Sequence, residues 1–479
     1  MKLKSLVASI MCCMAATAFA QDFEVNGIYY NIISDSEVEV TKNSDWFSNE
    51  YAGDIVIPET VTYFNKTYNV TKIAGQAFMH SGITSITIDN NVKEIGESAF
   101  ALSTNLTTAK LPDGIQSISN EMFHGCSLTA IHIPESVTQI GYSAFFECDF
   151  EEVNIPNSVT KIGFSAFDCC HNLTSINIPC GVTIIEYRTF YNCSSLASVT
   201  IPESVTEIQD EAFSFCKNLT SIYIPEKVSN IGNRAFQSSG LASVTLPANL
   251  SEIGSYTFHN TPFYNNLPDG TVYLGKILYS YKGEMPENAS ISIKEGTFSI
   301  SGNAFYNCIN LTAVNIPNTV KNIGMYAFAG CSNLKSVEIP NGITVLDECV
   351  FSGCSSLKTI TIPESVTSFN WRAMANCSAL EHIYNHAKTP AYCSEGVFEN
   401  TPVETCVLHV PTGCIDAYRA EESNWNQFKI IVDDAAGIED VTTADGPAEY
   451  FDLQGRKVTD PSNGIFIKKQ GNSTEKVLL

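Results

Sequence analysis

The sequence predicts an α/β solenoid of short parallel strands closed by small β-rich caps. A unit of about 23 residues recurs along the chain, typified by residues 196–216, LASVTIPESVTEIQDEAFSFC. Prolines recur in steps of 22 or 23 residues, with one gap of 70, at Pro112, Pro134, Pro156, Pro179, Pro202, Pro225, Pro247, Pro317, Pro340 and Pro363. Phenylalanines keep the same register, with Met374 in the last place, at Phe78, Phe100, Phe123, Phe145, Phe167, Phe190, Phe213, Phe236, Phe258, Phe305, Phe328 and Phe351. Such a period indicates a solenoid, because one unit is too small to bury its own apolar face.

Within each unit the pattern changes from strand to turn. Residues 199–201 alternate apolar and polar side chains, which predicts a short strand with one buried face. Pro202 has no amide hydrogen to donate and therefore ends the ladder. Ala212, Phe213 and Cys216 are three or four residues apart, which predicts a turn and a short helical or 3₁₀ segment.

The repeat pattern L-x-x-I-x-I-P-x-x-V-x-x-I-x-x-x-A-F-x-x-C resembles the BspA-like leucine-rich repeat over roughly residues 73–380. Several columns recur together in about a dozen units, so the resemblance is specific. It implies a leucine-rich repeat fold, terminal caps, and an association with adhesion at the cell surface.

Residues 1–20 have the pattern of a secretory signal peptide. A basic start at Lys2 and Lys4 precedes an apolar run that is too short to span a bilayer, and residues 18–20 form a small-x-small cleavage site. We expect cleavage after Ala20 and a secreted or outer cell-surface location. Lipidation is disfavoured, because the bulky Met11 precedes Cys12.

Residues 21–70 are predicted to form an N-terminal β cap. The Asn26-Gly27 pair stands between alternating residues, which is a strong signal for a tight hairpin turn, and residues 37–40 read as a further strand. Such a cap covers the hydrophobic end that a first repeat would expose. Packing is favoured over a ligand platform as the role of its many aromatic residues.

Residues 71–380 are assigned to the repeats. Outward strand positions carry mostly Ser, Thr and Asn, which stabilise any parallel sheet and can also bind a partner. Tyr223 and His132 are the ligand-binding candidates on this face, although they are too scattered to define a hot spot.

The repeats are interrupted at about residues 261–290. Pro-Asp-Gly followed by two apolar runs predicts a hairpin or a pair of strands there. The ligand-binding candidates, expected to be exposed, are Phe263, Tyr264, Tyr273 and Tyr279. Packing across the interruption is the alternative, and it is the more common role of such residues.

The C-terminal part is divided into three segments. Residues 381–432 predict a cap with a strand, a turn and an amphipathic helix, and residues 433–449 have the acidic, aromatic-poor composition of a linker. Residues 450–479 predict paired strands. They are similar to the small sorting-type C-terminal domains of surface and secreted proteins of Gram-negative anaerobes, which suggests a role in export or anchoring.

The cysteines indicate packing rather than disulfides. Nine of the 17 lie three residues after the phenylalanine column: Cys126, Cys148, Cys170, Cys193, Cys216, Cys308, Cys331, Cys354 and Cys377. Stacked side chains point the same way, which disfavours the disulfide dihedral, so we expect most thiols to be reduced and buried. The sequence also allows one disulfide in the C-terminal cap, between two of Cys393, Cys406 and Cys414.

Charge and motifs exclude several classes of function. A formal charge of −24 without a basic cluster disfavours nucleic-acid binding. His382 and His386 lack the glutamate of a zinc-protease helix and are read as a histidine pair of the cap. No catalytic motif, metal site or cofactor is predicted, and no membrane span beyond the leader.

These observations favour an exported, non-enzymatic recognition or adhesion protein. Its partner is expected to be an extracellular macromolecule, in the first place a protein, and the chain is expected to be a monomer. Glycan binding is the alternative, while a purely structural role and hydrolysis at an unrecognised site also stay open.

Overall fold

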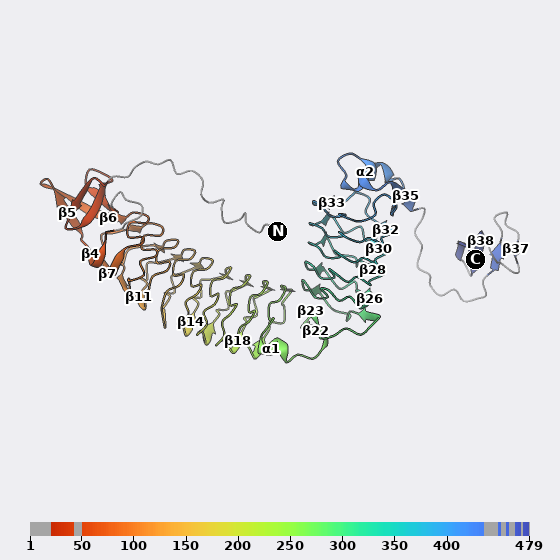
Figure 1. Cartoon of the computed structure of the whole chain (residues 1–479), viewed down its shortest axis with the longest axis horizontal. Coiled ribbons are helices and arrows are strands. Elements are labelled where there is room, and N and C mark those ends of the chain that lie inside the picture. Colours follow the sequence, from red (N-terminus) through yellow and green to blue (C-terminus); the bar gives the residue numbers. More distant parts are fainter. Residues whose placement is uncertain are drawn as a thin grey trace.

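The computed structural model describes residues 21–42, 50–434, 449–451, 457–458, 465–470 and 473–478. The predicted leader and most of the predicted linker lie outside these residues. Figure 1 shows the repeats stacked into an arch with two limbs. We call residues 50–265 the N-terminal limb and residues 270–434 the C-terminal limb. Strands β11, β14 and β18 lie along the outer edge of the arch, and β33 lies on its inner edge (Figure 1).

One repeat, or rung, shows how the sequence produces the fold. Strand β16 (Ser198–Thr200) ends before Pro202, whose carbonyl accepts a hydrogen bond from the amide of Val205 at 3.1 Å. The turned chain then forms the two-residue strand β17 (Glu207–Ile208). Each rung therefore contributes one strand to an outer ladder and one to an inner ladder.

The second half of a rung consists of turns, so the helical part of the predicted α/β class is wrong. Glu211 and Phe215 have φ values of 57° and 62°, in the left-handed region that interrupts a helix. The amides of Glu211, Phe213 and Phe215 donate to carbonyls of the next rung, at Asn233, Ala235 and Gln237. Since alternate amides bond between rungs, they cannot form the bonds of a continuous helix.

The outer ladders are parallel, and in their three-residue strands the middle residue points inward. Ser175 pairs with Ser198 and Asn177 with Thr200. Their strands are β4 (Ala52–Ile57), β7 (Gly82–Ile88), β9 (Thr108–Lys110), β11 (Ala130–His132), β14 (Ser175–Asn177), β16, β18 (Ser221–Tyr223), β20 (Ser243–Thr245), β24 (Ala289–Ser292), β26 (Leu311–Asn315), β28 (Ser336–Glu338), β30 (Thr359–Ile362), β32 (His382–Asn385), β34 (Val407–Pro411) and β35 (Ile430–Asp434).

The inner ladders are also parallel and consist of two-residue strands. They are β8 (Glu94–Ile95), β10 (Ser117–Ile118), β12 (Gln139–Ile140), β13 (Lys161–Ile162), β15 (Ile184–Ile185), β17, β19 (Asn230–Ile231), β21 (Glu252–Ile253), β25 (Ser299–Ile300), β27 (Asn322–Ile323), β29 (Val345–Leu346), β31 (Ser368–Phe369) and β33 (Tyr392–Cys393).

A six-stranded sheet precedes the first complete rungs. Strands β1 (Phe23–Val25) and β2 (Ile28–Ile32) form the predicted hairpin, with Asn26 and Gly27 at φ values of 53° and 77°. The sheet continues through β3 (Glu37–Thr41), β6 (Lys66–Ile73) and β5 (Thr60–Tyr63), and β6 also pairs with the inner strand β8. This pairing joins the cap to the solenoid.

The interruption contains a short helix and the predicted hairpin. Helix α1 spans Pro262–Asn265 and is capped by the Thr261 hydroxyl. Strand β22 (Gly270–Leu274) pairs antiparallel with β23 (Ile277–Lys282). Strand β23 continues the inner ladder into the C-terminal limb through β25, whereas no ladder joins it to β21 among the described residues.

Aromatic packing closes the C-terminal limb. After β34, helix α2 (Ile415–Arg419) and the 3₁₀ helix η1 (Asn424–Gln427) bury Tyr418 and Trp425 completely. A separate antiparallel sheet comprises β36 (Glu449–Phe451), β37 (Lys457–Val458), β38 (Ile465–Gln470) and β39 (Ser473–Leu478). The predicted strands are present, while the division into domains and the sorting role stay predictions.

The phenylalanine column forms stacks inside the rungs. Ring centroids of Phe190 and Phe213 are 5.3 Å apart, and those of Phe213 and Phe236 are 5.4 Å apart. The core divides at the interruption into two hydrophobic clusters, one up to Tyr279 and one from Leu278 onward. The predicted column thus holds within each limb but not as one unbroken stack.

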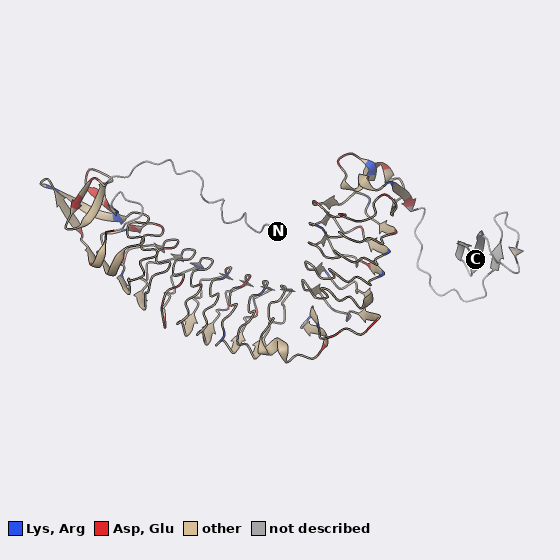
Figure 2. Cartoon of the chain, viewed as in Figure 1, with Lys and Arg blue, Asp and Glu red and all other residues tan. Residues whose placement is uncertain are grey.

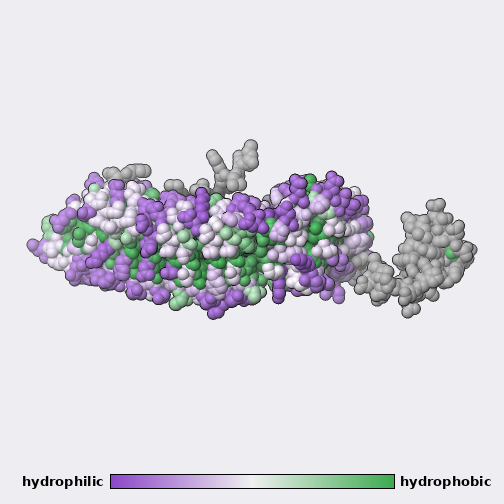
Figure 3. Space-filling model, turned by 90° about the horizontal axis from the view of Figure 1, so that it is seen from below, coloured by the Kyte–Doolittle hydropathy of each residue, from purple (hydrophilic) through white to green (hydrophobic). Residues whose placement is uncertain are grey.

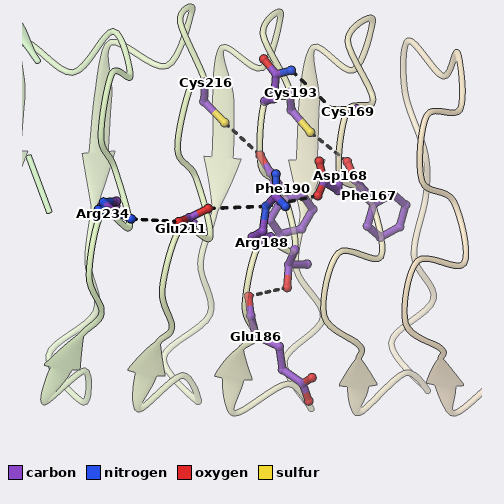
Figure 4. Close-up of polar contacts among 12 residues, drawn as sticks. Phe167, Asp168, Cys169, Glu186, Arg188, Phe190, Cys193, Glu211, Cys216 and Arg234 are labelled. Carbon is purple, nitrogen blue, oxygen red and sulfur yellow. Dashed lines mark hydrogen bonds and ion pairs between the residues drawn. The ribbon is translucent and has the colours of Figure 1, made fainter. Parts of the chain in front are cut away.

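The cysteines are free thiols, as predicted. All 15 described cysteines are unpaired, including Cys393, Cys406 and Cys414. In most of the column the thiol donates to the phenylalanine carbonyl one rung earlier, as Cys216 does to Phe190 at 3.1 Å (Figure 4).

Candidate ligand-binding site at the bend

The inner side of the bend between the limbs contains a recess of about 360 Å³. It lies where the inner ladder is broken between β21 and β23, and both limbs contribute its walls. Glu207, Asp210 and Glu252 come from the N-terminal limb, and Asp347 comes from the C-terminal limb. We call it the acidic recess, because four carboxylates and no Lys or Arg stand among the described residues that line it.

Like charges gather in the acidic recess. Burial by the surrounding walls raises the pKa of the Glu252 carboxyl, and the charges of Asp347, Glu207 and Asp210 raise it further. Asp210 is held in place by the backbone and side-chain N–H groups of Asn233, at 2.6 and 3.1 Å. The recess therefore carries a negative potential that its own residues do not neutralise.

Small residues form the floor of the recess. A Cβ at Gly232 would lie 2.4 Å from Asp210 Oδ1, and one at Gly254 would lie 2.5 Å from the Asn233 amide nitrogen. Adjacent rungs approach so closely here that only glycine fits. Ser299 and Ser301 are 1% and 3% exposed, and their hydroxyls have no hydrogen-bond partner among the described residues.

A second hollow of about 170 Å³, the tyrosine cleft, shares Gly302 with the acidic recess. Its walls are aromatic and polar: Tyr256, His259, Tyr264, Tyr279, Ser280, Tyr281, Asn303 and Tyr306. Tyr306 is 46% exposed, so its ring is available to a ligand. The two hollows together form one polar and aromatic surface on the inside of the bend.

Two candidates from the interruption meet in the tyrosine cleft, but none of the four candidates from that segment is exposed as expected, since Phe263, Tyr264 and Tyr273 are partly buried and Tyr279 is buried. Tyr264 is partly buried, with its hydroxyl 3.2 Å from the Ser280 hydroxyl. Tyr279 is only 4% exposed, and its hydroxyl oxygen accepts a hydrogen bond from the Phe258 amide. Its ring covers the end of the first phenylalanine stack, which explains the burial.

The other four candidates lie outside the tyrosine cleft. Phe263 packs edge-on against Phe258, and Tyr273 lies under Lys294 at 4.2 Å. Tyr223 and His132 are exposed on the outer strands β18 and β11, several rungs apart. The structure therefore does not bring the predicted residues together into one surface.

The outer face differs in character from the bend. Figure 2 shows few charged residues on its strands, and Figure 3, which views the arch from its outer side, shows a hydrophobic band along it. The middle residues of β11, β16 and β20 are only partly buried, which accounts for such a band. This face is repetitive and carries few charged residues, among them Lys110, Glu152 and Glu338.

An ion-pair network lies beside the recess on the N-terminal limb (Figure 4). Arg188 Nε is 3.4 Å from an Asp168 carboxylate oxygen and 3.5 Å from one of Glu211, which in turn pairs with Arg234 at 3.6 Å. The Arg188 guanidinium also covers the Tyr191 ring at 3.7 Å. Because these cations are already paired, they are not aimed into the recess.

The histidines expected to pair in the cap do not do so. His382 Nδ1 lies 3.1 Å from His409 Nε2, on the neighbouring outer strand, whereas His386 is exposed. Among the described residues, no group of His, Cys, Asp or Glu is arranged to hold a metal ion.

The acidic recess was not predicted from the sequence. Its carboxylates come from three rungs, with Glu207 and Asp210 in one, and each looks in the sequence like an ordinary solvated residue. The available signals were the recurring glycines beside the inner strands, as at Gly232 and Gly254, and the gap in the proline column. Neither signal indicates how sharply the stack of rungs bends, and the recess depends on that angle.

The fold is a repeat solenoid, and its candidate site is the pair of adjoining hollows at the bend. No helix in the described ranges approaches the length of a membrane span, since the longest, α2, has five residues. The family model "BspA type Leucine rich repeat region (6 copies)" matches residues 58–149, 138–264 and 279–410. The chain therefore belongs to the BspA-type leucine-rich repeat family.

Several solved structures are similar to this chain. A leucine-rich repeat protein from Bacteroides ovatus ATCC 8483 is 28% identical over 76% of this chain and 94% of that one, with a TM-score of 0.48. A leucine rich cell surface protein from Faecalibacterium prausnitzii A2-165 is 30% identical over 76% and 94%, with a TM-score of 0.36. The leucine rich repeat protein of T. pallidum is 29% identical over 40% and 87%, with a TM-score of 0.36. A search of curated proteins gives no match.

Proposed function

We propose that this protein is an exported recognition protein of the cell exterior that binds a macromolecular ligand, in the first place a protein, on the inside of its bend. The observation that carries the proposal is the junction of the acidic recess with the tyrosine cleft. Binding sites combine concave shape, aromatic surface and a few oriented polar groups, and the bend has all three. The family's association with surface binding supports the same role.

Two exposed tyrosines on opposite faces provide a matched test. Tyr306, 46% exposed, lies in the tyrosine cleft, and Tyr223, 51% exposed, lies on the outer strand β18. Immobilised extracellular-matrix proteins and whole cells would be probed with the full chain and with Tyr306→Ala and Tyr223→Ala. We expect Tyr306→Ala to weaken binding by about tenfold, as for an interface aromatic, and Tyr223→Ala to have little effect.

A larger loss of binding in Tyr223→Ala than in Tyr306→Ala would indicate that the ligand binds the outer face instead. Binding no stronger than that of an equally acidic control protein would contradict the proposal as a whole. Circular dichroism of both variants checks that neither change alters the fold.

Glycan binding is the second candidate, favoured by the tyrosine cleft itself. An exposed Tyr306 ring beside the Asn303 amide offers a stacking face and hydrogen-bonding groups to a sugar. An oligosaccharide array probed with the full chain and with Tyr306→Ala tests this. Array signals that Tyr306→Ala removes would favour the glycan, and an array without signals would reject it.

A further inference from the structure

We propose that the acidic recess binds a cationic side chain, the ammonium or guanidinium group of a lysine or arginine presented by a protein ligand. This inference rests on the proposed function and states which part of a ligand the bend recognises.

The charge of the recess is the first argument. Glu207, Asp210, Glu252 and Asp347 approach one another from both limbs, and no basic side chain lines the space between them. Two basic residues of the N-terminal limb close to its wall are already paired, Arg188 with Asp168 and Glu211, and Arg234 with Glu211. A recess with this charge is complementary to a cation supplied from outside.

The floor of the recess is the second, independent argument. Ser299 and Ser301 line the recess, and their hydroxyls are almost fully buried and have no partner among the described residues. Buried polar groups are nearly always hydrogen-bonded, so two unpartnered hydroxyls on one floor point to a partner that enters from the open side. An ammonium has three donors and a guanidinium five, enough for these hydroxyls and the carboxylates together.

The size of the recess favours an organic cation over a metal ion. Its volume of about 360 Å³ accommodates a long side chain, whereas no described group of acidic residues is arranged to hold a metal. Tyr187 and Met325 in its wall provide apolar surface for the methylene stem of such a side chain. The adjoining tyrosine cleft is then available to the residues that flank the lysine or arginine.

The experiment compares two doubly substituted chains with the same net charge. Glu207→Gln/Glu252→Gln removes two of the four carboxylates of the recess, and Glu152→Gln/Glu338→Gln removes two exposed carboxylates on the outer face. The probes are fluorescently labelled hexalysine and hexaarginine peptides, with a hexamer of acetyl-lysine as the uncharged control. Anisotropy titrations at about 0.15 M salt, where the Debye length is about 8 Å, suppress long-range attraction to the acidic body.

We expect the recess substitutions to weaken binding of the cationic peptides by about tenfold and the outer substitutions by less than about twofold. The acetylated peptide should not bind. Equal losses in both variants, or no loss in either, would overturn the proposal, because binding would then follow net charge or occur elsewhere. A third variant, Ser299→Ala/Ser301→Ala, keeps every charge, and unchanged peptide affinity in it would overturn the role of the floor hydroxyls.

The outcomes separate this inference from the proposed function. If the chain binds matrix proteins or cells and the recess substitutions leave that binding intact, the cation site is wrong and the recognition function stands. If peptides bind in the recess and no macromolecular ligand does, the recognition function fails and the cation site stands.

Discussion

Eight of the nine cysteines of the column, all except Cys308, donate to the carbonyl of the phenylalanine one rung earlier. Cys193 donates to the Phe167 carbonyl and Cys216 to that of Phe190, both at 3.1 Å. Burial raises the pKa of the Cys126 and Cys377 thiols to about 12. A neutral thiol is a weak donor and a poor nucleophile, so these residues pack and do not react.

We therefore predict that the native protein has few reactive thiols. Eleven of the 15 described cysteines are buried, three are partly buried and only Cys180 is exposed. Titration with Ellman's reagent at about pH 8 should find no more than about four rapidly reacting thiols, because thiolate is scarce when the pKa is high. In denaturant without reductant the full number should react; fewer than about five there would contradict the free-thiol structure.

A second prediction concerns the raised pKa of Glu252. The folded protein holds this proton more tightly than the unfolded chain, so the ionised carboxylate destabilises the fold above its raised pKa. Glu252→Gln should therefore raise the Tm at about pH 7, because it removes one charge facing Asp347, Glu207 and Asp210. The gain should shrink as the pH falls through the raised value and vanish below the ordinary value of 4.5.

Thermal melts across this pH range measure the effect. Glu338→Gln, on the outer strand β28, is the control and should show no such pH-dependent gain. A Glu252→Gln chain less stable than the wild type at neutral pH would show that the carboxylate has a stabilising partner instead.

At the scale of the element, the rung is the unit that must stack. Phe213 is fully buried between Phe190 and Phe236, with centroid distances of 5.3 and 5.4 Å. Its own amide and those of Glu211 and Phe215 donate to carbonyls of the next rung, so ring and backbone hold the same register. A rung thus depends on its neighbours for both packing and hydrogen bonding.

We predict that Phe213→Ala destabilises the protein by about 3 to 5 kcal/mol, because it leaves a cavity inside a close-packed stack. Phe213→Leu should cost about 1.5 kcal/mol or less, since it retains much of the volume. Tyr223→Ala, in the exposed outer ladder, should change stability by about 0.5 kcal/mol or less. Denaturant unfolding gives all three values, and a Phe213→Ala cost as small as that of Tyr223→Ala would contradict the stacked core.

At the scale of the whole molecule, the interruption divides one solenoid into two limbs. One hydrophobic cluster ends with Tyr279, the other begins with Leu278, and no ladder of described residues joins β21 to β23. In a repeat stack each rung is stabilised mainly by contacts with its neighbours. Because the ladder and the core are interrupted at this junction, the coupling between the two limbs should be weakest there. The same junction creates the acidic recess.

We therefore predict that the limbs unfold with partial independence. Phe328→Ala, in the second stack, should lower hydrogen-exchange protection throughout the C-terminal limb and leave the N-terminal limb protected. Phe213→Ala should show the reverse. Hydrogen exchange read by mass spectrometry measures both, and equal loss of protection in both limbs would show that the molecule unfolds as a single unit.

The sequence by itself determined the solenoid, its register, the N-terminal hairpin, the hairpin in the interruption and the buried cysteine column. These features depend on local alternation, turn residues and a strict period, so they can be recognised one unit at a time. Helical turns were predicted wrongly, because the spacing of Ala212, Phe213 and Cys216 suits a helix, while bonds to the next rung hold the chain in turns.

Only the tertiary structure decided where the solenoid bends and which side chains meet there. Glu207, Glu252 and Asp347 come from rungs on both sides of the interruption, and their approach follows from the angle between the limbs. A repeat pattern specifies how each rung sits on the next, whereas an angle between two stacks arises from packing around a segment that lacks the repeat. For the same reason, Tyr279 was expected at the surface and instead covers the end of the first stack.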